Sequence, residues 1–102
     1  MSLSVEVKNG AVYLPGAIAE QHFGKLETVI LIRRDFNLLV MPVHDVTAGG
    51  YLLKRRNASG DRVIHGADFL RDQGFDGDRS KRCEAYWDAS AAALVLPDVF
   101  VN

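Results

Sequence analysis

The sequence predicts one α+β domain, mostly β, in which two copies of a strand–helix–strand unit pack around a pseudo-twofold axis as a small barrel or sandwich. The chain of 102 residues is long enough for a single core. Its two halves also match at an offset of about fifty residues. The matching positions are Gly10 with Gly60, 16–17 with 66–67, Gly24 with Gly74, and 39–42 with 94–97. A unit this short leaves an apolar face and strand edges uncovered, so each copy is expected to cover the other.

The first repeat, about residues 4–45, is expected to open with two short strands. Val5 and Val7 alternate with polar neighbours up to a turn at Asn9-Gly10, and residues 12–14 continue in extended form. This pattern predicts a β-hairpin.

A short helix is predicted over residues 16–23. Pro15 stands at its entrance, where the missing N–H is harmless and the fixed φ suits a first helical turn. Gly24 follows the helix and can take the positive φ that ends it. The apolar runs 28–32 and 38–41 then flank a polar turn, which predicts a second hairpin.

The second repeat, about residues 51–98, follows the same order after a joint at 46–50. Its predicted elements are strands at 51–53 and 62–64 around a turn at 57–60, a helix at 67–73 ended by Gly74, and strands at 83–87 and 93–96 around a turn at 88–90. Residues 76–82, which alternate acidic and basic side chains, are expected to form a surface loop.

Gly10, an aliphatic run, Pro15 and a short helix ending at Gly24 stand in an order that resembles the opening signature of the AbrB, MraZ and SpoVT swapped-hairpin family. The following hairpin also fits the layout of that family. The resemblance implies a swapped-hairpin barrel formed by two copies within one chain. It further implies DNA binding by a transcriptional regulator, through arginines after the first turn and on the short helix.

The resemblance assigns DNA contact mainly to the second copy. Ala11 and Ala19 stand in the first copy where the family carries arginines, whereas the second copy has Arg62 after its turn and Arg71 on its helix. Lysines and arginines on turns commonly contact phosphates. The predicted DNA-binding residues are therefore Lys54, Arg55, Arg56, Arg62 and Arg71, with Lys8 across the pseudo-axis. The alternative is a solvated strand end whose charges are balanced by neighbouring aspartates.

A second hypothesis is a non-catalytic protein-interaction module that keeps the scaffold and has lost DNA binding. Val99, Phe100 and Val101 are apolar at a terminus, so they are expected either to add an edge strand or to bind a protein partner. A third hypothesis, an antitoxin, fits the small size and acidic balance. The sequence leaves open whether the pseudo-dimer forms a homo-oligomer.

The sequence contains few features that indicate an enzyme, a metal site or a membrane protein. Neither a nucleophile elbow nor a glycine-rich phosphate loop is present, and His22, His44 and His65 have no metal-ligand spacing. Cys83 is alone and is expected to be a buried thiol in a strand. We therefore expect a cytoplasmic protein that is not an enzyme, with no cofactor and no membrane partner. The net charge of −1 argues against a global positive field.

Overall fold

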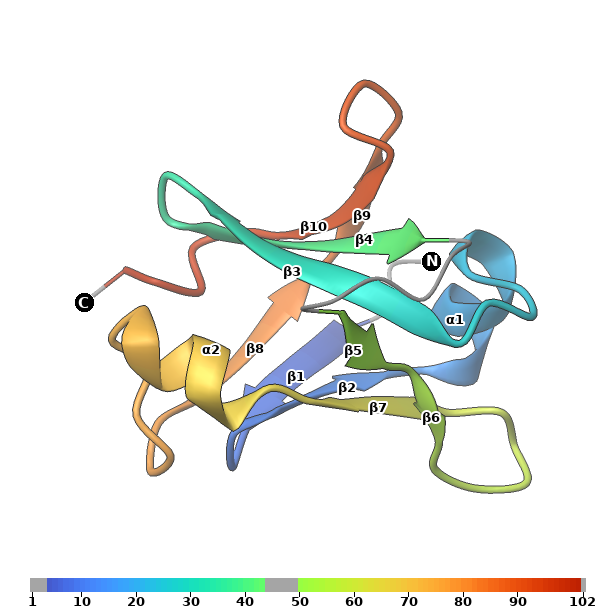
Figure 1. The fold of residues 1–102 in the computed structure, drawn as a ribbon, viewed down its shortest axis with the longest axis horizontal. Coiled ribbons are helices and arrows are strands. Elements are labelled where there is room, and N and C mark those ends of the chain that lie inside the picture. Colours follow the sequence, from blue (N-terminus) through green and yellow to red (C-terminus); the bar gives the residue numbers. More distant parts are fainter. Residues whose placement is uncertain (1–3, 44–49, 102) are drawn as a thin grey trace.

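The computed structural model describes residues 4–43 and 50–101, and it confirms a mostly β fold with two short helices (Figure 1). The described strands form two antiparallel five-stranded sheets, and the closed barrel that we expected is not detected among them. The first sheet contains, in spatial order, β6 (Lys54–Arg55), β7 (Arg62–His65), β2 (Ala11–Leu14), β1 (Ser4–Lys8) and β8 (Ser80–Glu84). The second contains β5 (Tyr51–Leu52), β3 (Thr28–Arg34), β4 (Asn37–Val43), β10 (Ala93–Leu96) and β9 (Tyr86–Asp88).

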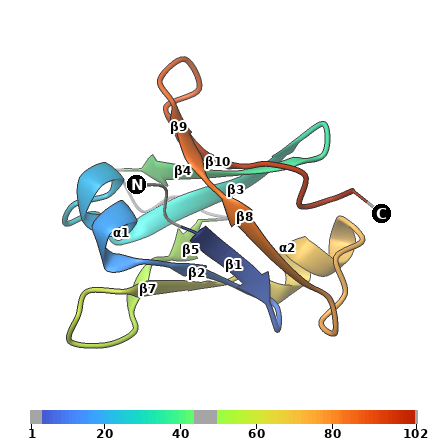
Figure 2. The same cartoon turned by 180° about the vertical axis from the view of Figure 1, so that it is seen from behind.

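Both sheets combine strands from the two halves of the chain. In the first sheet β1 pairs with β8, and in the second sheet β5 pairs with β3, so each half gives its opening strand to the other half. Figure 2 shows β1 and β8 side by side from behind. Neither half forms a sheet of its own, which agrees with the small apolar surface that a unit of this size can bury.

The register of the central strands fits a twofold relation between the halves. In the first sheet Tyr13 pairs with Val63, which lies fifty residues later in the chain. Next to this pair, Glu6 faces Tyr13 on one side and Lys54 faces Val63 on the other. Glu6 and Lys54 therefore occupy equivalent positions, and by the same ladders the pair Val7–Val12 is equivalent to the pair Arg55–Arg62.

The helices α1 (Gly16–His22) and α2 (Ala67–Asp72) lie at opposite ends of the first sheet (Figure 1). Helix α1 follows β2 and α2 follows β7, and each packs near a turn of the other half. The backbone N–H of Gly66, before α2, donates to the carbonyl of Gly10 at 3.0 Å. The N–H of Gly16, at the start of α1, donates instead to the Asp61 carboxylate at 2.7 Å.

Turn residues adopt the conformations that the sequence predicts. Asn9 and Gly10 both have positive φ, 53° and 72°, as a two-residue type I′ hairpin turn requires. Gly24 and Gly74 have φ of 55° and 86° just beyond the two helices. The hairpin between β3 and β4 turns at Asp35, whose φ is 57°.

The main core lies between the two sheets. Its fully buried members come from the inward-facing positions of strands in both sheets, from α2 and from the segment after α2. They include Val5, Val7, Val12, Leu14, Val29, Leu38, Val40, Ile64, Leu70, Phe75, Leu94 and Leu96. Cys83 is buried in β8 as predicted, and its Sγ lies 3.7 Å from the carbonyl oxygen of Val5.

Two parts of the prediction need correction or fall outside the described residues. Residues 80–82 were expected in a surface loop, but they form the first part of β8 and pair with β1. The charged side chains favour a loop by sequence, but they lie on the exposed face of a strand in which exposed Arg82 alternates with buried Cys83.

The joint residues 46–49 and His44 lie outside the described residues. None of the helices in the described ranges is both long and apolar enough to cross a membrane.

Candidate functional site

Alternation along one strand divides the predicted basic cluster into two groups. Lys54 lies opposite Val63, in the row that continues to Tyr13 on β2, whereas Arg55 lies opposite Arg62. Because successive side chains of a strand point to opposite faces, Lys54 and Arg56 point away from the core and Arg55 points to the core side of the sheet edge. Arg55 and Arg56 therefore lie on different faces, and Lys54 lies on the outer face at the edge of a hollow that Arg55 also lines.

Lys8 and Arg56 meet at the ring of Tyr13 on the outer face of the first sheet, the face directed away from the core. The Lys8 Nζ lies 5.5 Å from the ring centroid, and the Arg56 guanidinium carbon lies 4.7 Å from it. Both distances are within the range of a cation–π interaction. The backbone N–H of Arg56 donates to the Asp61 carbonyl, so the pairing of β6 with β7 extends by one more residue pair. This pair, Arg56 with Asp61, corresponds to the pair Lys8 with Ala11 in the first half. We call Lys8 and Arg56 the axial cation pair.

Acidic side chains partly balance the outer face. A Glu6 carboxylate oxygen lies 3.7 Å from the Lys8 ammonium, and the other lies 3.4 Å from the Arg82 guanidinium. Lys54, at the position equivalent to Glu6, has the opposite charge. The outer face is therefore most basic on the side of β6, where Lys54 and Arg56 are both exposed.

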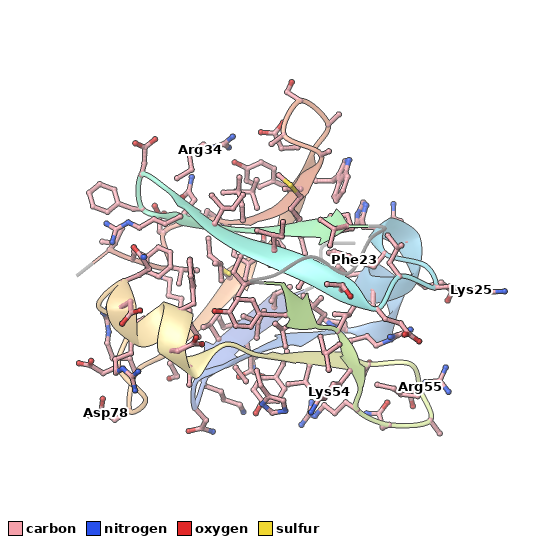
Figure 3. The ribbon with its side chains drawn as sticks, in the orientation of Figure 1. Phe23, Lys25, Arg34, Lys54, Arg55 and Asp78 are labelled. Atoms are coloured by element: carbon pink, nitrogen blue, oxygen red, sulfur yellow. The ribbon has the colours of Figure 1, made fainter. Side chains whose placement is uncertain are left out.

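Arg55 and Arg62 line a cleft between α1 and the β6–β7 loop, which we call the α1 cleft. Its volume is about 440 Å³, and its lining also includes Ala19, Glu20, Gly24 and Lys25. An adjoining hollow of about 390 Å³ shares Arg55 and Arg62 and adds Glu27 and Lys54. Figure 3 shows Lys25, Lys54 and Arg55 at this same end of the molecule. The Arg62 side chain is positioned by a 3.0 Å hydrogen bond to the Leu53 carbonyl.

Asp61 anchors the loop that forms one wall of the α1 cleft. One carboxylate oxygen accepts the Gly16 N–H at 2.7 Å, and the other accepts the Asn57 side-chain amide at 3.0 Å. The Asn57 side chain in turn accepts the N–H groups of Ser59 and Asp61. The hydrogen bonds from Asn57 and Gly16, in that order of importance, lower the pKa of Asp61 below its ordinary value.

Arg71 does not join either group of cations. It lies in the last turn of α2, at the end of the sheet opposite to β6 and the β6–β7 loop (Figure 1). A single ligand surface that combines Arg71 with Lys54 and Arg56 is therefore not formed by this fold.

The predicted partner-binding tail is largely used within the chain itself. Val99 and Phe100 are only 1% and 4% exposed, and both belong to the main core. The Phe100 N–H donates to the Phe36 carbonyl, and the Arg33 guanidinium carbon lies 5.0 Å from the centroid of the Phe100 ring. Burial removes Val99 and Phe100 from any surface that a partner reaches, so only Val101 remains exposed.

His22, His65 and Cys83, which the structure describes, are not gathered into a metal or catalytic cluster. His22 stacks on Trp87 with ring centroids 4.8 Å apart, and His65 is exposed on the outer face. Within residues 4–43 and 50–101 no cluster of metal-ligating side chains is found. Burial raises the pKa of Cys83 to about 11, so its thiol is protonated and unreactive at neutral pH.

Two residues of these sites were missed by the sequence prediction. Tyr13 was assigned only to a strand, although its position in the β2–β7 pair places it between two cations. Lys25 was not singled out, although it directly follows the glycine that ends α1. Their roles depend on the pairing of the two halves, which a residue pattern does not show.

Comparison with known proteins adds no family to these observations. The chain matches no protein-family model, and neither curated proteins nor solved structures give a match.

Proposed function

We propose that the chain is a non-catalytic DNA-binding regulator of AbrB/MraZ-like architecture, and that it contacts the DNA backbone with Lys8, Lys54 and Arg56. The observation that carries the proposal is the axial cation pair. Lys8 and Arg56 come from equivalent positions of the two halves and meet at Tyr13, beside the pair that relates the halves. Cations arranged about a twofold axis suit the local twofold symmetry of a DNA duplex.

The exchange of strands between the halves supports the architectural part of the proposal. In a swapped-hairpin scaffold each copy must lend strands to the other, and here β1 pairs with β8 while β5 pairs with β3. The sequence resemblance around Gly10 and Pro15 points to the same scaffold. The proposal therefore combines a pattern in the sequence with an independent feature of the strand pairing.

The proposed contact is small and mainly electrostatic. Three phosphate contacts give a slope of about −2.7 in a plot of log affinity against log salt, which is about a 40-fold loss between 50 and 200 mM salt. Glu6, which pairs with Lys8 and Arg82, weakens the field on one side of the axis. We therefore propose that the side with Lys54 and Arg56 makes the stronger contact.

Fluorescence anisotropy tests this function directly. The purified protein is titrated into a random duplex pool and into the DNA upstream of its own gene, at about 50 and 200 mM salt. The variant Lys54→Gln/Arg56→Gln is expected to bind more weakly and to have a salt slope smaller by about 2. Arg71→Gln, at the opposite end, is the control and is expected to bind as the wild type does.

Absence of binding at low salt overturns the DNA-binding proposal. A protein-interaction module then becomes the better hypothesis, and the exposed apolar side chains become the candidate contacts with a protein partner. Phe36 is the first candidate, because it is 54% exposed beside the buried Phe100. Binding to such a partner is expected to be nearly insensitive to salt.

A further inference from the structure

We propose that the α1 cleft binds a small phosphate-bearing molecule, independently of any contact between the outer face and DNA. The inference comes from comparing the two ends of the first sheet. The end near α2 is filled with apolar side chains, whereas the equivalent end near α1 is open and lined by cations.

The strand pairing shows that the two ends of the first sheet differ in charge. Val7 and Val12 pair on β1 and β2, and both are fully buried. The equivalent pair on β6 and β7 is Arg55 and Arg62. Two buried valines in one half are thus replaced by two arginines that face the α1 cleft in the other half.

The hydrogen bonds of α1 and α2 show which residues at the two ends hold corresponding places. Helix α2 begins one residue later than the fifty-residue offset of the strands predicts, so we compare the helices by their hydrogen bonds. Ala19 and Leu70 hold corresponding places, because each donates its N–H to the carbonyl of the residue just before its helix, Pro15 or Gly66. Gly24 matches Gly74 in sequence and in its positive φ, but the N–H that bonds to the carbonyl five residues earlier belongs to Gly24 after α1 and to Phe75 after α2.

The change in side-chain size at these positions explains why one end is open. Leu70 and Phe75 are buried in the main core at the α2 end, with exposed fractions of 0% and 2%. Ala19 and Gly24 line the cleft at the α1 end, and they have almost no side chain to fill it. The α1 cleft is therefore the unfilled counterpart of a packed apolar region.

The cations of the α1 cleft, Lys25, Arg55 and Arg62, form no ion pair within the part of the chain that the structure describes. Arg55 and Arg62 lie directly opposite each other, an arrangement of like charges that destabilises a strand pair. An anion bound between them would remove this repulsion.

The chemistry of the cleft favours a small phosphate compound over DNA. Arginine side chains bind phosphate through paired hydrogen bonds, and Lys25 adds a third positive charge. The volume of about 440 Å³ lies within the rough range of 300 to 1,000 Å³ for small-molecule sites. Glu20 and Glu27 stand at the two hollows, where they repel a continuous polyanion and can accept hydrogen bonds from ligand hydroxyl groups.

Nuclear magnetic resonance of the full chain, labelled with nitrogen-15, tests this site with an internal control. Inorganic pyrophosphate and ribose 5-phosphate are titrated separately at constant ionic strength, and the backbone amide signals of glycines are followed. Gly16, Gly24 and Gly60 line the α1 cleft, whereas Gly10, Gly66 and Gly74 belong to the α2 end. We expect saturable shifts for the first set and none for the second.

Two variants separate this site from the DNA contact. Arg55→Gln/Arg62→Gln is expected to raise the dissociation constant of both probes at least tenfold, while Lys8→Gln/Arg56→Gln, at residues that line neither hollow, leaves it within threefold. Shifts that do not saturate, that appear equally at both ends, or that persist in Arg55→Gln/Arg62→Gln overturn the proposal. Saturable binding of citrate without binding of either phosphate probe also overturns it. If Arg55→Gln/Arg62→Gln does not fold, Lys25→Gln is tested in its place and is expected to weaken binding at least threefold.

Discussion

At the α2 end of the first sheet, a two-residue turn packs backbone against backbone on the helix. At the α1 end, a longer loop reaches its helix through a carboxylate, and a cation-lined cleft remains between them. At the α2 end the Gly66 N–H donates to the Gly10 backbone carbonyl, whereas at the α1 end the Gly16 N–H donates to the Asp61 side chain. The comparison teaches that two related ends of one sheet differ in character: the α2 end is packed with apolar side chains, and the α1 end presents charge.

The largest expected effect comes from emptying the packed end. Phe75→Ala removes a side chain that is 2% exposed, so we expect a loss of about 4 kcal/mol in the free energy of unfolding. Phe36→Ala is the control, because that side chain is 54% exposed and its loss should change stability by less than about 0.5 kcal/mol. Urea denaturation measures both. Equal losses would show that the α2 end is not the packed one.

A smaller effect is expected at the equivalent turn glycines. A Cβ at Gly10 would lie 2.6 Å from the Ala67 Cβ, whereas a Cβ at Gly60 would have no atom within 4 Å. Both residues have positive φ, so backbone strain alone costs about 1 kcal/mol in each alanine variant. Gly10→Ala adds overpacking, and its total loss should be about 3 kcal/mol. Similar losses in thermal unfolding of the two variants would contradict the close packing at α2.

The smallest effect concerns Asp61 and the pH dependence of the α1 end. The pKa of Asp61 is lowered in the folded protein, so its charge stabilises the fold above the pKa of the unfolded chain, which is about 4. This contribution is lost as pH falls through the lower folded pKa. The difference in melting temperature between wild type and Asp61→Asn should therefore shrink as pH falls from 7 to about 3. Asp78→Asn, on the surface at the other end, is the control and should show no such convergence.

The order of elements could be predicted from the sequence because it depends on local signals. Glycines with positive φ, Pro15 before α1 and apolar runs mark turns, helices and strands within a few neighbouring residues. The strand at 80–82 was missed because Lys81 and Arg82 are charged, and their strand conformation depends on pairing with β1. Propensity carries no information about such a distant partner.

The candidate sites could be predicted only in part. Basic residues around β6 were correctly singled out as a group, but their division between two faces follows from strand register. The cleft itself results from small residues, Ala19 and Gly24, at positions that are filled in the other half. Only the pairing of the halves shows which positions are equivalent, so the sequence pattern could not indicate this cavity.

Lys54 and Arg56 are proposed to contact DNA, whereas Arg55 and Arg62 face the α1 cleft. One pair of DNA titrations distinguishes these two roles. Anisotropy at about 50 mM salt compares Lys54→Gln/Arg56→Gln with Arg55→Gln/Arg62→Gln on the same duplex. Each variant removes two positive charges, so a difference between them reports position rather than net charge. We expect the first variant to lose at least tenfold in affinity and the second less than threefold. Equal losses would contradict this expectation and would place all four cations on one surface.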